Sequence, residues 1–474
     1  MLIPRGWRGQ CWATSRYNFA GGSPTQRVLA AASVAGLFFL YFFGLTRTGL
    51  VGPDEPRYAA IGKAMAATGD WITPRLWGVA WFEKPALPYW MTAIGFKAGL
   101  GAELAPRLPV ALGSVAFLIY FFVLLRREFG NRAAWYSATI LGTSVGWLVY
   151  SHVAITDLPM SAAFAAAMLL LLTETPVSGS RPLAAGVLLG LAVLAKGLVP
   201  LALFIPALWF LRRRIRDVAF VFLAATVIAA PWYILVTLRN GAPFLEEFFW
   251  RHHFGRFLNS ALQHERPVWF YVPVLMAAVF PWTPLLALLF SPRIFQDRRA
   301  RFLLAWFAWG FLFFSVSRNK LPGYLLPLLP PLAALIGIAA AEARARSPKV
   351  MAVLAASAVL LCLVPPLEDI LPQMLLVGIS HTPLRLATLW MIPALLVGIA
   401  SAYAEKNGRR DLAVSLIAAC TALAVATVVW RVFPELDRQV SGRAAGSMTC
   451  LPPTSRSQRY STDYYAGREL PDCK

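Results

Sequence analysis

The chain has 474 residues, of which 58% are hydrophobic and only 14% are charged. So few charged side chains cannot cover the surface of a soluble protein, and repeated apolar runs of about 20 residues match the length that an α-helix needs to cross a bilayer. The net charge of +21 does not indicate nucleic-acid binding, because the basic residues form short clusters at the ends of these runs, as membrane anchoring requires. The runs do not alternate apolar and polar residues, so we expect an all-α polytopic membrane protein.

The apolar runs divide the chain into three parts. Residues 1–27 are basic and polar without a recognisable cleavage site, which predicts a cytoplasmic N-terminal segment before an uncleaved first span. A transmembrane domain is expected over 28–433, and a short periplasmic tail over 434–474. Two polar loops interrupt the domain, at 48–107 and 239–267. Thirteen spans are expected, near 28–47, 106–125, 133–150, 155–173, 182–196, 198–211, 218–237, 268–290, 302–316, 321–341, 350–366, 384–403 and 411–433.

Short basic loops predict the orientation of these spans. If the N-terminus lies inside, all the short basic clusters lie on the cytoplasmic side, in agreement with the positive-inside rule. The two long loops, the Ser317–Lys320 turn and the tail then lie outside, where their mixed charge indicates a site for anionic substrates. The clusters are 126–132, 212–216, 292–301, 343–349 and 405–410.

The first long loop is the longest polar interruption, and a connection of this size is expected to be functional. Tyr58, Ile61 and Met65 have the spacing of one helix face, and Gly69 is placed to end that helix. A second helix is expected to begin near Pro85 and Pro88, since proline is tolerated in a first turn. We expect both helices to lie along the membrane surface.

Acidic residues in two places are candidates for catalysis. Asp54 and Glu55 directly follow the first span, and Asp157 lies at the outer start of the fourth. An aspartate before a helix is often only an N-cap, but a carboxylate at the interface could also take a proton from an acceptor, and the two roles are compatible. Asp54 and Asp157 together suit general-base work with orientation of a second group, or joint metal binding.

Basic residues on the same side are candidates for binding a phosphate leaving group, whose developing charge Arg or Lys would neutralise. Each of them, taken alone, is also explained as an interfacial anchor. Tyr324 lies one turn after Lys320, and Lys196, between two spans, is hard to explain by solubility. The basic set is Arg57, Lys84, Arg256, Arg318 and Lys320.

Two further pairs concern metal binding and disulfide formation. Glu83 and His264 could share a divalent metal, although the spacing indicates no third ligand. Cys450 and Cys473 both lie in the polar tail, and they could form a disulfide if the tail is extracytoplasmic.

Several motifs resemble a known family. The segments GPDEPRYA, GDWITPRLWGVAWFEKPALPYW and APRLPVALGS resemble the ArnT-like branch of the GT-C glycosyltransferases, and the likeness continues through AITDLPM, LAKGLVP, QHERPVWFYVPVL, PWTPLL and SRNKLPGYLLPLLPPLA. The best-known members transfer 4-amino-4-deoxy-L-arabinose from undecaprenyl phosphate to lipid A, and the branch is related to the protein O-mannosyltransferases. The resemblance covers roughly residues 28–340.

The resemblance implies a GT-C fold with 13 spans in the bacterial inner membrane and an active site facing the periplasm. It further implies that Asp54 is the catalytic base, that Asp157 supports it, and that Arg57 and Lys84 contact the lipid-linked phosphate. Glu83 and His264 match two ligands of a structural metal found in one branch.

We therefore expect an inverting, single-displacement glycosyltransferase that uses a polyprenyl-phosphate sugar and a lipid A-like or other periplasmic acceptor. One base and a cluster of cations suffice for this reaction, so no cofactor is required. A lipid or solute transporter is the alternative, but it predicts ionisable residues within the spans, where this sequence has few. A non-catalytic assembly subunit is a third interpretation. The sugar stays open among aminoarabinose, galacturonic acid, mannose and a hexosamine.

Overall fold

The computed structural model describes residues 35–36, 38–172, 180–254, 266–291, 294, 296–364, 391–445, 448–452 and 454–473. These parts are mostly helical, with one antiparallel hairpin formed by β1 (Arg75–Leu76) and β2 (Val79–Ala80). The helices are α2 (Asp54–Thr68), α3 (Leu87–Lys97), α4 (Gly101–Thr143), α5 (Val145–Ser151), α6 (Asp157–Leu170), α7 (Arg181–Lys196), α8 (Val199–Leu203), α9 (Ile205–Leu211), α10 (Ile215–Asn240), α11 (Ala242–Leu245), α13 (Tyr271–Ala278), α14 (Arg298–Val316), α15 (Leu329–Glu342), α16 (Pro348–Leu360), α18 (Met391–Lys406), α19 (Arg410–Val440) and α20 (Arg456–Ala466). Short 3-10 helices lie at Val268–Phe270, Thr283–Phe290, Pro322–Leu328, Leu361–Leu363 and Arg443–Ala445, and a π-helix lies at Glu246–Phe254.

The chain is a helical, multi-pass membrane protein. Within the described residues, five helical segments are long and apolar enough to cross a bilayer, and a sixth counts if a pair bent by 110° is one span. This count does not test the expected thirteen, because parts of the runs 28–47, 350–366 and 384–403 lie outside the described residues and several other apolar runs form short or divided helices. The run 198–211 is divided into α8 and α9, and the run 268–290 contains the bent pair. The five segments are Gly101–Thr143, Ile215–Asn240, Arg298–Val316, Pro322–Glu342 and Arg410–Val440.

Small residues let the central helices approach one another closely. A Cβ at Gly186 of α7 would lie 2.3 Å from the carbonyl oxygen of Val221 on α10, and one at Gly337 of α15 would lie 2.1 Å from Ser137 Oγ on α4. Hydrophobic burial drives little association between helices in lipid, so close van der Waals packing of small residues takes its place. α15 is buried along nearly its whole length, and it forms the centre of the bundle.

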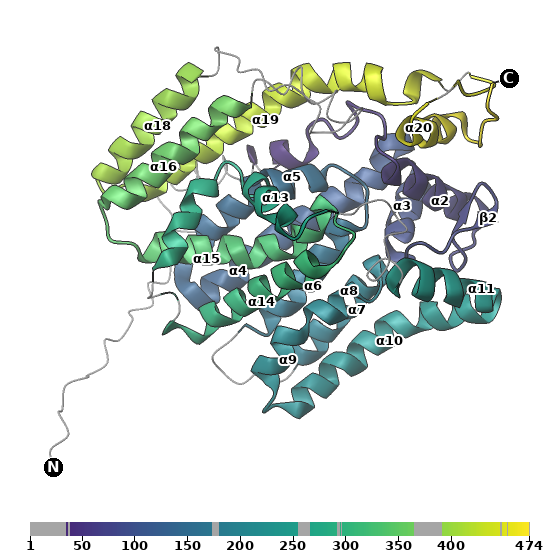
Figure 1. Ribbon diagram of the computed structural model, residues 1–474, viewed down its shortest axis with the longest axis horizontal. Helices are drawn as coiled ribbons and strands as arrows, with labels where there is room; N and C mark the ends of the chain where they lie inside the picture. The colour runs from purple at the N-terminus through teal and green to yellow at the C-terminus, as the bar shows by residue number, and fades with distance from the viewer. Residues whose placement is uncertain are drawn as a thin grey trace.

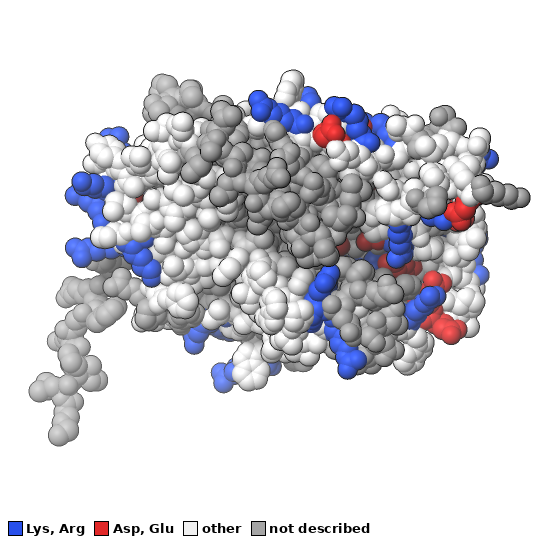
Figure 2. All heavy atoms as spheres, turned by 45° about the horizontal axis from the view of Figure 1, so that its top comes forward, with Lys and Arg blue, Asp and Glu red and all other residues white. Residues whose placement is uncertain are grey.

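The polar elements gather at one end of the molecule. Figure 1 shows α2, α3, β2, α11 and α20 together at the right-hand end, and α10 and α19 run toward that end from the opposite side. On the face drawn in Figure 2, most of the visible acidic side chains lie toward this same end. The candidate site residues from the first loop therefore lie at the ends of the long helices.

Both helices expected in the first loop are present. Gly69 ends α2 with φ of 72°, and its N–H donates to the carbonyl of Met65; Pro88 lies in the first turn of α3. Residues 55–62 of α2 are all buried, since α3 and α20 both pack against this helix. α2 is therefore embedded in protein, which a simple amphipathic surface helix would not be.

Candidate active site

The first loop is tied to the membrane helices through Asp70. One carboxylate oxygen of Asp70 accepts hydrogen bonds from the backbone N–H groups of Ile72 and Thr73 and from the Arg239 guanidinium at the end of α10 (2.8 Å). The indole of Trp232, also on α10, donates to the Ile72 carbonyl (3.0 Å). These contacts fix the loop on the bundle and so provide a rigid frame for the charged residues on either side of the hairpin.

Glu55 forms a buried ion pair with Arg107. Its two oxygens accept both arms of the Arg107 guanidinium at 2.7 and 2.8 Å, and they also accept the backbone N–H groups of Val51 and Ala154. The Glu55 side chain is 0% exposed and that of Arg107 is 3% exposed. Because every contact of the carboxylate is internal, this geometry favours a structural role for Glu55, a candidate catalytic acid from the sequence.

Asp54, the neighbouring acid, faces the opposite way. Its side chain is 41% exposed and pairs with Arg57, which is only 3% exposed. The N-cap of α2 is Pro53 without a side-chain cap bond, so the Asp54 carboxylate is not used as a cap. An exposed carboxylate held by a buried cation is oriented and still accessible to a reactant.

A row of alternating charges extends from Asp54. Arg57 lies 3.2 Å from one Glu83 oxygen, and the Lys84 ammonium lies 3.3 Å from the other. Glu83 and Lys84 are both buried, in the turn that precedes α3. The tertiary fold thus joins the DEPR and FEKP motifs into one cluster that contains two acids and two cations.

Arg57 is held on several sides. Its Nε donates to the Pro53 carbonyl (2.8 Å), and its guanidinium carbon lies 5.3 Å from the ring centroid of Trp81 and 5.0 Å from that of Tyr460. Burial opposes the charged form, but Glu83 and Asp54 outweigh it and keep the pKa of Arg57 above its usual range. The guanidinium is therefore a permanent positive charge in a site that is partly shielded from water.

Asp157 belongs to a second cluster. It lies in the first turn of α6 and accepts a 2.6 Å hydrogen bond from Lys196, the last residue of α7. The Lys196 ammonium also lies 4.6 Å from the ring centroid of Tyr324. Both charged side chains are about nine-tenths buried, with 14% and 10% exposed. Thr156 is the N-cap and makes no side-chain cap bond, so capping does not explain Asp157 either.

Tyr150 lies beside the Asp157 cluster. Gly323 closes the same region, since a Cβ there would lie 2.6 Å from an Asp157 oxygen and 2.8 Å from the Tyr150 hydroxyl. Asp157, Tyr150 and Gly323 therefore lie close together, although they are far apart in the sequence.

Lys320 is a buried cation four residues before Tyr324. Its ammonium donates to the backbone carbonyls of Ser317 and Arg266, the latter at 3.1 Å, and burial lowers its pKa below the usual lysine value. Arg318, from the same turn, is exposed. Of these two candidates, Lys320 has the enclosed position that an anion site requires.

The metal prediction rests on residues only partly described. His264 and Arg256 lie outside the described residues. Glu83 is described, but each of its oxygens already faces a cation. Across the described ranges there is no group of three or more His, Cys, Asp or Glu side chains placed to hold a metal. A metal shared by Glu83 and His264 therefore stays a prediction.

Several neighbours of the candidate residues had weak or no signals in the sequence. Lys196 could be noticed as a lysine between two apolar runs, but nothing indicated that Asp157 is its partner. Arg107 was one of many charges in the first loop. Tyr150 and Tyr460 had no signal, because their importance depends on contacts far along the chain.

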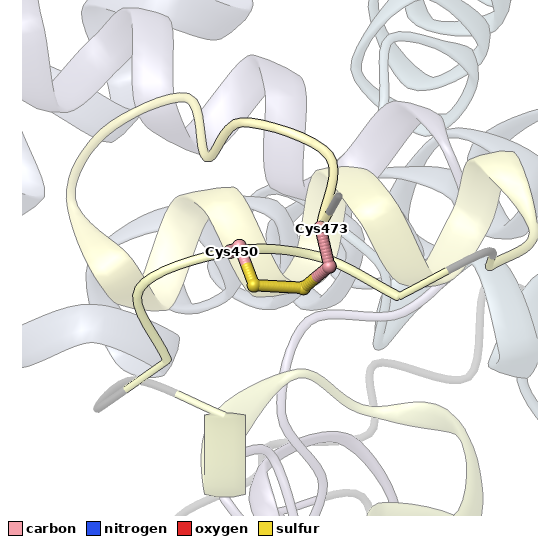
Figure 3. Close-up of a disulfide and its surroundings, with 2 residues drawn as sticks. All are labelled: Cys450 and Cys473. Atoms are coloured by element: carbon pink, nitrogen blue, oxygen red, sulfur yellow. A yellow bond between two sulfur atoms is a disulfide. The ribbon is translucent and has the colours of Figure 1, made fainter.

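The C-terminal tail folds over this end of the molecule. Cys450 and Cys473 form a disulfide with a sequence separation of 23, shown in Figure 3. The loop that it closes contains α20, which packs against α2. The tail is thus part of the site's surroundings.

Comparisons with known proteins agree with this architecture. Residues 83–235 match the family described as dolichyl-phosphate-mannose-protein mannosyltransferase. An undecaprenyl phosphate-α-4-amino-4-deoxy-L-arabinose arabinosyl transferase of Pseudomonas aeruginosa is 36% identical over 321 residues, which are 64% of this chain and 57% of that protein. A protein of the same name from Serratia proteamaculans is 33% identical over 356 residues, 70% of this chain and 64% of its own. The crystal structure of ArnT from Cupriavidus metallidurans bound to undecaprenyl phosphate is 26% identical, with a TM-score of 0.76 over 94% of this chain and 86% of that one. The chain belongs to the ArnT-like branch of the GT-C glycosyltransferases.

This ArnT-like chain matches only part of the length of these relatives. It spans a little over half of the Pseudomonas protein, at 57% of its length. The resemblance read from the DEPR and FEKP motifs is confirmed, and the family match begins at Glu83, the acid of FEKP. The charged cluster built from these two motifs is therefore the candidate active site of an ArnT-like protein.

Proposed function

We propose that this protein transfers a sugar from a polyprenyl-phosphate donor to a lipid A-like or other periplasmic acceptor, with Asp54 as the general base. The observation that carries the proposal is the contrast within one ion pair: the Asp54 carboxylate is 41% exposed, whereas its partner Arg57 is 3% exposed. The exposed carboxylate can reach an acceptor hydroxyl, and the buried arginine fixes its direction.

The reaction is an inverting displacement. The acceptor oxygen attacks the anomeric carbon and forms the new C–O bond while Asp54 takes the acceptor's proton. The bond from the anomeric carbon to the phosphate oxygen breaks, and polyprenyl phosphate leaves with the electron pair. Arg57, Lys84 and Lys320 stabilise the negative charge that develops on this leaving group. Asp157 acts with Lys196 as an orienting pair beside Tyr324.

The membrane arrangement supports a lipid-linked donor. A polyprenyl tail stays in the bilayer, so its phosphate is presented at the ends of the helices, where the charged cluster lies. We infer thirteen spans over 28–433 and an active site that faces the periplasm of a bacterial inner membrane. Basic segments 212–216 and 405–410, next to the starts of α10 and α19, lie at the end opposite to α2 and α20, which supports this orientation (Figure 1).

The names of the relatives support a particular substrate pair. The Pseudomonas and Serratia proteins are named for transfer of aminoarabinose from undecaprenyl phosphate, and the Cupriavidus protein binds undecaprenyl phosphate in its crystal structure. We propose aminoarabinose as the first sugar to test. Acceptors should be tested broadly, from lipid A to other glycolipids, because the match covers only 57% of the Pseudomonas protein.

The test is transfer of a labelled sugar from polyprenyl-phosphate donors in reconstituted vesicles. We expect Asp54→Asn to reduce kcat by roughly a hundredfold to ten-thousandfold, the usual range for a lost general base. Asp217→Asn is the matched control. Asp217 lies in the first turn of α10, whereas the first loop contacts the last turn of that helix through Arg239. Full activity of Asp54→Asn would contradict the assignment of the base, and absence of transfer by the wild type from a broad donor panel would bring the transporter interpretation forward.

A further inference from the structure

The C-terminal helix α20 contacts the charged cluster although it lies some 400 residues further along the chain. The ring of Tyr460 on this helix lies 5.0 Å from the guanidinium carbon of Arg57. Trp81, from the first loop, contributes a second ring at 5.3 Å from the same carbon. Aromatic rings at this distance attract a guanidinium, and the attraction strengthens where water is excluded, as it is around Arg57.

α20 is anchored to the segment that leads into Asp54. Ser461 Oγ donates to the Leu50 carbonyl (2.7 Å) and accepts from the Gly442 N–H (2.8 Å). The Tyr465 hydroxyl accepts from the Leu50 N–H (2.9 Å) and lies 3.0 Å from a Glu103 oxygen, to which it donates. The backbones are in close contact, since a Cβ at Gly442 would lie 2.3 Å from the backbone nitrogen of Thr462. A displacement of α20 would therefore disturb the entry to α2.

The disulfide closes the unit that holds Tyr460. Cys450 and Cys473 are on either side of α20 in the sequence, and backbone hydrogen bonds of 2.8 Å join Leu451 to Pro471 and Cys473 to Leu451 (Figure 3). A covalently closed loop has fewer alternative conformations, so the helix inside it keeps its orientation. Tyr460 thus reaches Arg57 from a constrained support.

Arg57 needs such support if it is to bind a phosphate. A guanidinium has five N–H donors, and the contacts to Pro53, Asp54 and Glu83 direct donors toward protein acceptors. We propose that Tyr460 is a positioning residue: together with Trp81 it holds the plane of the Arg57 guanidinium so that its remaining N–H groups face the phosphate of the donor. The inference rests on the proposed function, because it takes Arg57 to be a ligand of that phosphate.

Two substitutions of Tyr460 separate the effect of its aromatic ring from the effect of α20 as a whole. Tyr460→Phe keeps an aromatic face and should behave like the wild type. Tyr460→Leu keeps apolar packing but loses the face, and we expect it to raise the donor KM roughly twofold to thirtyfold, the range for a cation–π contact from exposed to desolvated. kcat should change less than KM, since the contact is present before the transition state. Arg459→Leu, a change of the neighbouring residue on α20 that pairs with Asp472, is the matched control.

A double-mutant cycle tests whether Tyr460 acts through Arg57. Binding of undecaprenyl phosphate to the purified protein in nanodiscs is titrated for the wild type, Tyr460→Leu, Arg57→Gln and the double variant. We expect Tyr460→Leu to weaken binding in the wild type and to have little further effect beside Arg57→Gln. An equal effect in both backgrounds, or wild-type affinity in Tyr460→Leu, would overturn the inference while leaving the transferase proposal intact. A wild type that neither binds the lipid phosphate nor transfers a sugar would instead contradict the proposed function itself.

Discussion

Asp54 and Glu55 are adjacent in the sequence and differ completely in environment. Successive side chains on a helix point in directions about 100° apart, so one residue of the first turn of α2 can be exposed while the next faces the interior. Glu55 pairs with the buried Arg107 near the start of α4, whereas the Asp54 side chain is 41% exposed. The DE pair therefore combines a candidate base with a residue that stabilises the fold around it.

This division predicts different effects of two conservative changes. Glu55→Gln removes the charge that compensates the buried Arg107, and we expect it to destabilise the protein by about 3–5 kcal/mol, as for other broken buried ion pairs. Asp54→Asn removes the charge of an exposed carboxylate and should change stability by less than about 1 kcal/mol. Thermal unfolding of the purified variants in detergent would measure both effects.

The transfer activity of the same two variants should also differ. At a temperature low enough for Glu55→Gln to fold, this variant should keep part of the transfer activity. Asp54→Asn should fold normally and lose the transfer activity. If Glu55→Gln were as stable as the wild type and inactive, the structural role assigned to Glu55 would be wrong.

Lys320 predicts a dependence of donor binding on pH. Burial lowers its pKa below the usual 10.5, so as pH rises its ammonium loses its proton earlier than an ordinary lysine would. The folded state disfavours the charged form of Lys320, so this group lowers the free energy of unfolding. The full penalty applies below the lowered pKa of the folded state, and it decreases as pH rises toward the pKa of the unfolded state. Attraction of the donor phosphate changes in the opposite sense and weakens with rising pH.

The measurement is the donor KM between neutral pH and about pH 10. We expect the KM to rise toward the alkaline end for the wild type. Lys320→Met should have a higher KM at neutral pH without this rise, whereas Lys320→Arg should stay charged throughout. A rise that persists in Lys320→Met would mean that another group is responsible.

Sequence patterns found the candidate acids and cations but not the contacts that give them distinct roles. Asp54, Arg57, Glu83 and Lys84 lie in two motifs of the first loop, so their common location could be predicted. The partner of Glu55 lies 52 positions away, and the ring beside Arg57 comes from the last helix. Such long-range pairs are set by tertiary packing, which local spacing does not contain. The roles of Arg256 and His264 stay predictions, because both lie outside the described residues.

At the scale of helices, α7 and α10 show how small residues replace hydrophobic burial. Gly186 and Gly190 of α7 face the backbone of α10, where an added Cβ would lie 2.3 Å and 2.8 Å from the carbonyl oxygens of Val221 and Ala225. Real Cβ atoms do not approach a carbonyl oxygen at these distances, so larger residues must push the two helices apart. This pair holds Lys196 in place, since Lys196 is the last residue of α7.

A pair of glycine substitutions isolates this effect. Gly186→Ala should destabilise the protein by about 1–3 kcal/mol through overpacking and should weaken transfer by displacing Lys196 from Asp157. Gly113→Ala on α4 is the matched control, because no atom lies within 4 Å of the position that its added methyl group would take; helix propensity alone should stabilise it by about 0.5–1 kcal/mol. Melting temperatures of both variants measure the difference, and equal temperatures would show that α7 and α10 adjust without strain.

The elements of the first loop were predictable from the sequence and are present, whereas the number of spans stays a prediction. Gly69 and Pro88 act through the backbone, so the end of α2 and the start of α3 follow from local sequence. An apolar run, in contrast, predicts only that its residues are buried in lipid or protein. It does not predict that they form one straight helix. The run 268–290 therefore reads as one span, although its two helical parts are bent by 110°.

Across the whole molecule, the charged residues form two different patterns: short basic loops, and ion pairs of opposite charge. Basic segments at the starts of α10 and α19 are short loops, which orient membrane helices. The opposite end holds acids and bases together, in compact ion pairs such as Asp157–Lys196 and Glu83–Lys84. The first pattern is typical of membrane insertion, and the second is the arrangement that the proposed anion-binding site requires.

This distribution predicts which side of the membrane each end occupies. Val79, at the hairpin, is 70% exposed, and Asn407 lies in the short connection between α18 and α19. In intact bacterial cells with a permeabilised outer membrane, a membrane-impermeant maleimide should label Val79→Cys and leave Asn407→Cys unlabelled until the inner membrane is opened. The experiment uses a background in which Cys11, Cys362 and Cys420 are replaced by serine, so that only the Cys450–Cys473 disulfide remains. Labelling of Asn407→Cys in intact cells together with protection of Val79→Cys would reverse the orientation and place the carboxylates in the cytoplasm, where a periplasmic acceptor could not reach Asp54.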